Sequence, residues 1–144
     1  MIIRGGASIF RTEEQQHSFN FPYQLGTGSK DRPCDAQFFT VQIQEGDLVL
    51  VGSDGLFDNL FDEDILSIIH SITGGTSPSH MISLNPFEIS SQLAKRAKEV
   101  AEDTRYASSP FQSRALQEGR EDIIPSLLFI LFHPLKPQQL SNSS

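Results

Sequence analysis

The fold expected for this chain is decided by one stretch, residues 45–60, which reads EGDLVLVGSDGLFDNL. Residues 48–51 are continuously apolar and rich in Val and Leu, which predicts a strand buried on both faces. That strand would present Asp54 at its carboxyl end, and Gly55 would let the backbone turn at once. Rigid scaffolds often carry reactive groups at such positions. A carboxylate there is a natural ligand for a hard cation such as Mg²⁺ or Mn²⁺.

A purely structural interpretation of the same stretch stays open at this point. Asp-Gly is a frequent turn pair, and Asp58, Asp62 and Asp64 are equally typical of caps and solvated charge. An EF-hand over residues 58–64 is excluded because Glu63 stands where the loop needs glycine. From these residues alone, the chain is a soluble domain with a candidate cation site.

The residues before this stretch predict hairpins. Residues 1–11 form two short apolar runs around Gly5-Gly6, which is typical of a tight turn. A sheet that opens at the first residue leads us to expect that upstream sequence is missing. Residues 12–36 are polar and turn-rich, and we expect Phe19 and Phe21 to anchor them. Residues 39–44 alternate apolar and polar, which predicts a half-exposed strand pairing with residues 48–51 across an acidic turn.

The residues after the stretch predict two helices and a last strand. Three acidic residues open a helix over 62–72. Asn85, Pro86 and Glu88 open a second one that runs to about residue 102. Residues 73–84 and 103–125 are expected to be a linker and a loop. Residues 127–132 are expected to be a strand, and the Pro- and Ser-rich tail 133–144 to be disordered.

Composition limits the class of protein. The 144 residues carry a formal charge of −7, which argues against nucleic acid as a partner. The single cysteine, Cys34, excludes an internal disulfide and a thiolate zinc site. The longest apolar run, residues 126–132, is too short to span a bilayer, so no membrane partner is expected. No targeting segment is visible.

Several motifs together resemble the type 2C family of metal-dependent protein serine/threonine phosphatases. Residues 47–60 are similar to its Gly-Asp, apolar strand, Ser/Thr-Asp-Gly-Leu-x-Asp motif. Residues 15–25, QQHSFNFPYQL, resemble the preceding segment in the mitochondrial and plastid-type branch. Ala94-Lys95-Arg96-Ala97 and Ser108-Ser109-Pro110-Phe111 resemble a later helix and loop. The resemblance covers about residues 1–131 in the right order.

The resemblance implies a fold and a chemistry. The fold would be α+β, a partial type 2C phosphatase β-sandwich flanked by helices, with residues 1–132 as the C-terminal part of the domain. The activity would be hydrolysis of phosphoserine and phosphothreonine in proteins by a water activated between two Mg²⁺ or Mn²⁺ ions. The implied metal ligand is Asp54. At the late ligand position stands Glu121, or Asp122 if the register slips by one. Full-length members of this branch would be mitochondrial or plastid proteins.

The resemblance also implies what this chain lacks. The early half of the family, with its bridging Asp, phosphate-binding Arg and catalytic His, has no counterpart, and neither His17 nor His70 fits by position. We therefore expect a truncated chain that is inactive alone. The alternative is a pseudophosphatase, a non-catalytic module that binds a phosphatase or phosphoprotein partner. An unrelated cation-binding α+β domain is a third hypothesis. In a half-domain, residues 48–51 and 127–132 would leave a sheet face uncovered, which favours self-association.

Overall fold

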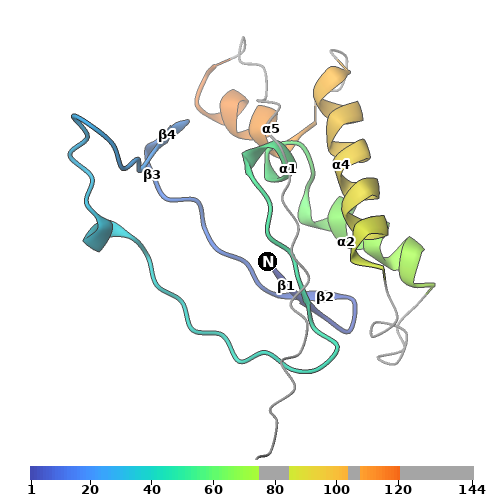
Figure 1. Ribbon diagram of the computed structural model, residues 1–144. Coiled ribbons are helices and arrows are strands. Elements are labelled where there is room, and N and C mark those ends of the chain that lie inside the picture. Colours follow the sequence, from blue (N-terminus) through green and yellow to red (C-terminus); the bar gives the residue numbers. More distant parts are fainter. Residues whose placement is uncertain (75–84, 104–107, 121–144) are drawn as a thin grey trace, which may run out of the picture.

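The computed structural model describes residues 1–74, 85–103 and 108–120 of the chain. These residues contain both sheets and helices, so the expected α+β class is confirmed. Figure 1 shows the long helices on one side of a short sheet, while residues 19–44 form an arm that leads away on the other side. The expected strand 127–132 and tail 133–144 lie outside the described residues.

The predicted N-terminal hairpin is confirmed. Strand β1 (Ile2–Arg4) pairs antiparallel with β2 (Ala7–Phe10), and the turn between them places Gly5 and Gly6 at φ 56° and 82°. Backbone of that handedness favours glycine, which explains the pair. A third strand, β5 (Leu48–Val49), pairs antiparallel with the other edge of β1, so the sheet has the order β2-β1-β5.

The predicted hairpin over residues 39–51 does not form. Its acidic turn is present, since the Asp47 amide donates to the Gln44 carbonyl at 3.1 Å. Residues 39–44, however, are not a strand. β5 has two residues rather than four, and Val51 is 62% exposed, so that stretch is not buried on both faces. An alternating pattern forms a strand only where a neighbouring edge pairs with it. Here β5 pairs with β1 instead.

Residues 12–36 contain a small second sheet. It consists of β3 (Gln16–Ser18) and β4 (Phe21–Pro22), and a short 3₁₀ helix, η1 (Pro33–Asp35), follows. Phe19 anchors this region as expected, because its ring packs against that of Phe111, with 5.3 Å between the two ring centroids. The same expectation is wrong for Phe21, which is 60% exposed.

Four helices complete the described fold. α1 (Asp54–Phe57) follows β5, and α2 (Asp62–Thr73) and α4 (Pro86–Glu102) are the two predicted helices. The Asn85 side chain accepts from the Phe87 amide at 3.1 Å, as a helix cap does. α5 (Pro110–Gln117) contradicts the expected loop over 103–125. Its Ser109 cap and Gln112 form a capping box, a signal already present in the sequence.

The core lies between the sheet and the helices. It gathers buried side chains from β1, the end of β5, and helices α1, α2 and α4: Met1, Ile3, Leu50, Leu56, Leu60, Ile65, Ile69, Ile89, Leu93, Ala97 and Val100. Leu56 is fully buried, so one side of α1 packs into this core. Asp54, at the N-terminal end of α1, lies at the surface.

Candidate functional site

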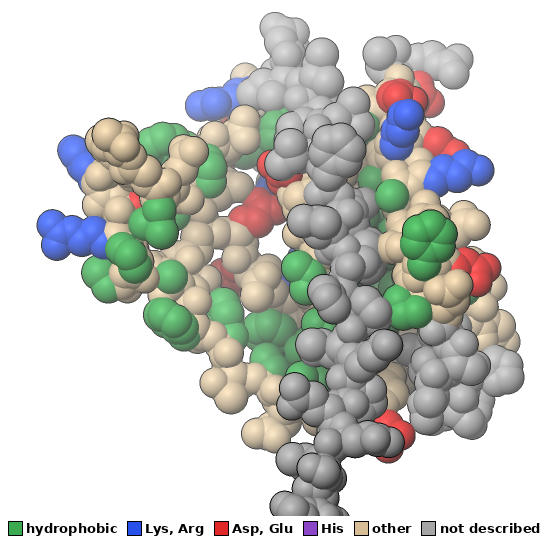
Figure 2. Space-filling model, in the orientation of Figure 1, with side chains coloured by type: hydrophobic (Ala, Val, Ile, Leu, Met, Phe, Trp, Pro, Cys, Tyr) green, Lys and Arg blue, Asp and Glu red, His purple; other side chains and the backbone are tan. Residues whose placement is uncertain are grey.

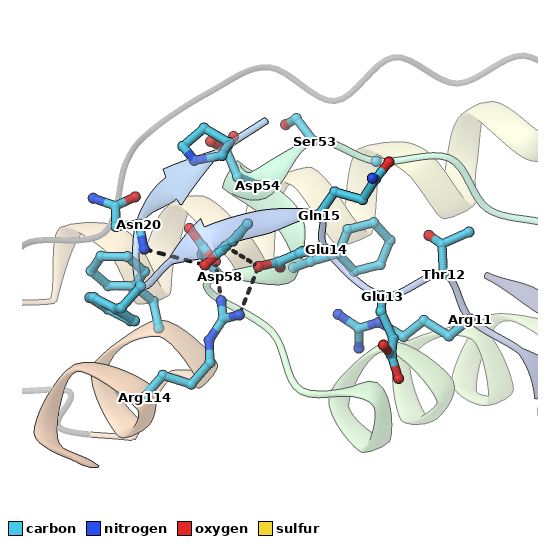
Figure 3. A pocket seen from close by; sticks show the side chains of 16 residues that line it. Arg11, Thr12, Glu13, Glu14, Gln15, Asn20, Ser53, Asp54, Asp58 and Arg114 are labelled. Carbon is cyan, nitrogen blue, oxygen red and sulfur yellow. Dashed lines mark hydrogen bonds and ion pairs between the residues drawn. The ribbon is translucent and has the colours of Figure 1, made fainter. Parts of the chain in front are cut away.

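Asp54 is the first residue of helix α1, directly after the segment that continues β5. The structure corrects the expected turn, because Gly55 is helical and buried rather than at a bend. Asp54 is exposed and lines a cavity of about 310 Å³ (Figure 3). One of its carboxylate oxygens, Oδ1, accepts a hydrogen bond from the Gly55 amide at 2.8 Å.

Close packing explains the residues around α1. A Cβ on Gly52 would lie 2.7 Å from Leu56 Cδ2 and 3.1 Å from Phe57 Cε2, so the chain can approach the helix this closely only at a glycine. At the other end of α1, the Asn59 side-chain amide donates to the Gly55 carbonyl at 3.0 Å. Asn59 is itself buried, and it thus ties the helix to the core.

The central feature of the cavity is an arginine that bridges two carboxylates, here called the Arg114 cluster (Glu14, Asp58 and Arg114). Arg114 Nη1 donates to Glu14 Oε2 at 2.7 Å, and Arg114 Nη2 donates to Asp58 Oδ1 at 2.8 Å. Figure 3 shows the guanidinium of α5 reaching between the two acids. The cluster therefore joins three segments that are far apart in the sequence.

The carboxyl group of Asp58 has an unusual protonation equilibrium. Its side chain is 8% exposed. Burial, and then the charge of Glu14, raise the pKa of Asp58 to about 6, while Arg114 opposes the shift and the charge of Asp54 adds to it. The sequence interpretation of Asp58 as a cap is confirmed by its C-cap position on α1, whereas the interpretation as solvated charge is wrong. Asp64 is a cap as expected, since it accepts from the Phe61 amide at 3.2 Å.

The other wall of the cavity comes from the segment that follows β2. Arg11 pairs with Asp62, and its guanidinium carbon lies 4.7 Å above the centre of the Phe57 ring. Gln16 donates to Glu14 Oε2 at 2.7 Å, which connects this wall to the Arg114 cluster. The charged groups of the lining are therefore four carboxylates and two arginines that are already paired, set among uncharged polar and apolar side chains.

The donor chemistry of Asp54 fits a hard divalent cation, but the number of donors does not make a complete site. Among the described residues, no group of three or more His, Cys, Asp or Glu side chains could hold a metal ion. Glu121 and Asp122, the predicted late ligands, lie outside the described residues, and their role stays a prediction. Two of the histidines lie elsewhere, His17 beside Asp31 at 2.8 Å and His70 on a second cavity.

Two residues of the site were not foreseen from the sequence, Glu14 and Arg114. Each is an ordinary surface-type charge in a polar segment, and they lie 100 positions apart. The capping box at Ser109 predicts a helix there, and that helix would have raised the question of what Arg114 faces. No local pattern predicts its partners.

None of the helices in the part of the chain that the structure describes is both long and apolar enough to cross a membrane.

The sequence of this chain is similar to those of protein phosphatases of type 2C. No family model matches the sequence. The chain is 38% identical over 119 residues to probable protein phosphatase 2C 26 of Arabidopsis thaliana and 36% identical over 119 residues to probable protein phosphatase 2C 80 of the same species. It is 33% identical over 127 residues to the human protein phosphatase PTC7 homolog. These matches cover 82% to 83% of this chain.

A solved structure agrees with the sequence matches. The X-ray structure of the photosystem II phosphatase PBCP superposes with a TM-score of 0.65 at 33% identity, over 82% of this chain and 42% of that one. The match confirms the expected α+β fold as part of a type 2C phosphatase fold. The chain spans 36%, 27% and 40% of the lengths of the three relatives named above.

Proposed function

Because this chain belongs to the type 2C protein phosphatase family, we propose that it forms part of a protein serine/threonine phosphatase domain in which Asp54 binds a divalent cation, Mg²⁺ or Mn²⁺. The substrates would be phosphoserine and phosphothreonine side chains of proteins. We further propose that residues 1–132 are the C-terminal part of that domain, and that the chain does not hydrolyse phosphoesters alone. The share of its relatives that it spans, between 27% and 40% for those named above, supports this last point.

One observation carries the proposal: Asp54 stands exposed on a polar cavity, at the start of a helix that the core holds in place. Mg²⁺ and Mn²⁺ prefer carboxylate oxygen, and Asp54 supplies it. Glu121 or Asp122 would add a second carboxylate. A bound divalent ion would supply charge neutralisation for the phosphoryl group and would lower the pKa of a bound water. The role of the chain itself is to fix the carboxylate on the cavity wall.

The proposal is tested with two proteins and one substrate, p-nitrophenyl phosphate with Mn²⁺. The purified chain should show no turnover above background. A chimera in which this chain replaces the matched segment of an active type 2C phosphatase should hydrolyse the substrate, and Asp54→Ala should abolish that activity. Asp103→Ala, which removes an aspartate just after α4 at the C-cap position, is the matched control. A chimera that keeps its activity after Asp54→Ala would contradict the role of Asp54.

The alternative is a non-catalytic module that binds a phosphatase or a phosphoprotein, and one observation favours it. Large apolar side chains are exposed along the arm of residues 19–44: Phe21, Tyr23, Leu25, Phe38, Phe39 and Ile43. Figure 2 shows such side chains gathered over this arm. Exposed apolar groups that lie together are typical of association surfaces.

Light scattering combined with thermal unfolding tests association. We expect the chain to self-associate, because part of its apolar surface remains in water. A monodisperse monomer with a cooperative transition above about 60 °C, the upper end of the range for mesophilic domains, would show that no partner is needed for folding.

A further inference from the structure

Helix α1 carries Asp54 but is too short to hold its own position. It contains four residues. A single helical turn does not persist in water without tertiary contacts, because helix nucleation is unfavourable. The orientation of Asp54 towards the cavity must therefore come from the groups that bind α1 from outside. Leu56 supplies one attachment by packing into the core, which leaves the polar end to be fixed by hydrogen bonds.

Two hydrogen bonds join helix α5 to Asp58, the residue that caps the carboxyl end of α1. The Phe111 amide donates to the Asp58 carbonyl at 3.0 Å, and Arg114 Nη2 donates to the Asp58 carboxylate at 2.8 Å. The Asp58 amide in turn donates to the Asp54 carbonyl at 2.7 Å. A continuous series of bonds thus leads from α5 through Asp58 to the backbone of Asp54.

The same guanidinium also holds the opposite wall of the cavity. Arg114 Nη1 bonds to Glu14, which accepts a second bond from Gln16 at the start of β3. Arg114 therefore joins the carboxyl end of α1 to this wall, in addition to the contact of Arg11 with the Phe57 ring (Figure 3). Arg114 Nε is buried and has no acceptor among the described residues, so the two carboxylates alone orient the group.

We infer that Arg114 is a positioning residue for the cation site: by bonding Asp58 and Glu14 at once, it fixes Asp54 on the cavity wall and strengthens cation binding there. The inference rests on the proposed function of Asp54. Arg114 itself touches neither cation nor substrate. Its planar guanidinium can bond two carboxylates in different directions, whereas a lysine ammonium acts as a point charge. Arg114→Lys should therefore restore only part of the effect.

The test measures Mn²⁺ binding to the whole chain through paramagnetic broadening of the Asp54 and Gly55 amide signals in NMR spectra. Arg114→Ala should weaken the affinity by about tenfold, the lower end of the effect seen for residues that orient metal ligands. Glu14→Gln should have a smaller effect, since it leaves Asp58 attached to α5. Lys98→Ala, which removes a cation from an exposed pair on α4, is the control and should change nothing.

A second measurement needs no metal. Hydrogen exchange at the Asp58 amide should become faster in Arg114→Ala by a larger factor than exchange in the buried part of α4, which follows the global free energy of unfolding. Faster exchange at Asp58 together with unchanged Mn²⁺ affinity would overturn the positioning role, because Arg114 would then serve stability alone. Absence of broadening at Asp54 in the unaltered chain would instead count against the proposed function, whatever the exchange experiment shows.

Discussion

Two aspartates of this chain are each bound by an arginine, yet they differ in acidity by several orders of magnitude. Asp47 lies under the N-terminal hairpin, where Arg4 Nε and Nη2 each bond one of its oxygens at 2.7 Å. That hydrogen bonding lowers the pKa of Asp47 to about 2. Asp58 lies in the cavity and is bound by Arg114, yet its pKa is raised to about 6. Both side chains are almost inaccessible, at 1% and 8% exposure.

Burial raises the pKa of Asp58 most, and the number of acids that share one arginine adds to the difference. Arg4 bonds a single acid among the described residues, Asp47, and its Nη2 also donates to the Gln42 carbonyl at 3.0 Å. The Gln44 amide adds a third bond to Asp47 at 2.8 Å. Arg114 divides its guanidinium between Asp58 and Glu14, and Asp54 adds a further negative charge nearby. Attraction in the cavity therefore does not compensate for burial and repulsion together. The hairpin pair is built for stability, whereas the cavity holds more negative charge than its arginines neutralise.

The largest expected effect concerns the pH dependence of stability. Because the pKa of Asp58 is higher in the folded chain than in the unfolded one, its contribution favours folding at low pH and is lost as pH rises from about 4 to 6. A shift of about two units corresponds to at most about 3 kcal/mol. Asp58→Asn should flatten this part of the profile, measured by urea unfolding at pH 4.5 and pH 7. Equal slopes in both proteins would refute the assignment.

Removing the shared arginine should come next in size. Arg114→Met leaves Asp58 buried beside Glu14 without a cation, and we expect a loss of about 2 kcal/mol at pH 8. This is less than for a fully buried pair, because the Arg114 side chain is 38% exposed. The loss should shrink at pH 5, where Asp58 takes up a proton. A loss that is independent of pH would mean that only packing is affected.

The hairpin pair should respond in the opposite direction. Arg4→Lys replaces two hydrogen bonds with one, so the pKa of Asp47 should rise from about 2 towards its ordinary value. A lowered pKa contributes stability above the ordinary value and loses it as pH falls through 2. The variant should therefore begin to unfold at a higher pH on acidification. Carboxyl NMR titration gives the pKa directly, and no change would show that one bond suffices.

The smallest effect is expected on the exposed face of α4. Lys98 and Glu102 form a pair at 3.6 Å, and both side chains are more than half exposed. Lys98→Ala should change the free energy of unfolding by less than about 0.5 kcal/mol, because such pairs are screened by solvent. A larger loss of the free energy of unfolding in urea would mean that solvent exposure does not weaken this pair relative to the pairs in the hairpin and the cavity.

The local parts of the fold could be predicted from the sequence. Gly5-Gly6 predicts the hairpin, and the caps at residues 62–64 and at Asn85 predict α2 and α4, because turn and cap preferences act within a few residues. The alternating residues 39–44 mislead, since strand formation depends on an available edge, which periodicity does not report. Helix α5 was predictable in the same way as α4, from a cap followed by proline.

The candidate site was predictable only in part. The place of Asp54 after an apolar run predicts it as a candidate ligand. The bond between Arg114 and Glu14 joins residues 100 positions apart, so no local pattern predicts it. The burial of Asp58 likewise depends on segments that meet only in the folded chain. The sequence therefore predicts which residue offers a ligand and leaves undetermined what holds it.

The long span of the Arg114 cluster has a kinetic consequence. Arg4 can meet Asp47 once the first 47 residues exist, whereas the cavity requires residue 114 to reach residue 14. Contacts of large sequence separation close large loops and tend to form late in folding. During synthesis from the N-terminus, the hairpin pair would then form before the cavity. A folding φ-value near zero at Arg114, with a higher one at Ile3, would display this order.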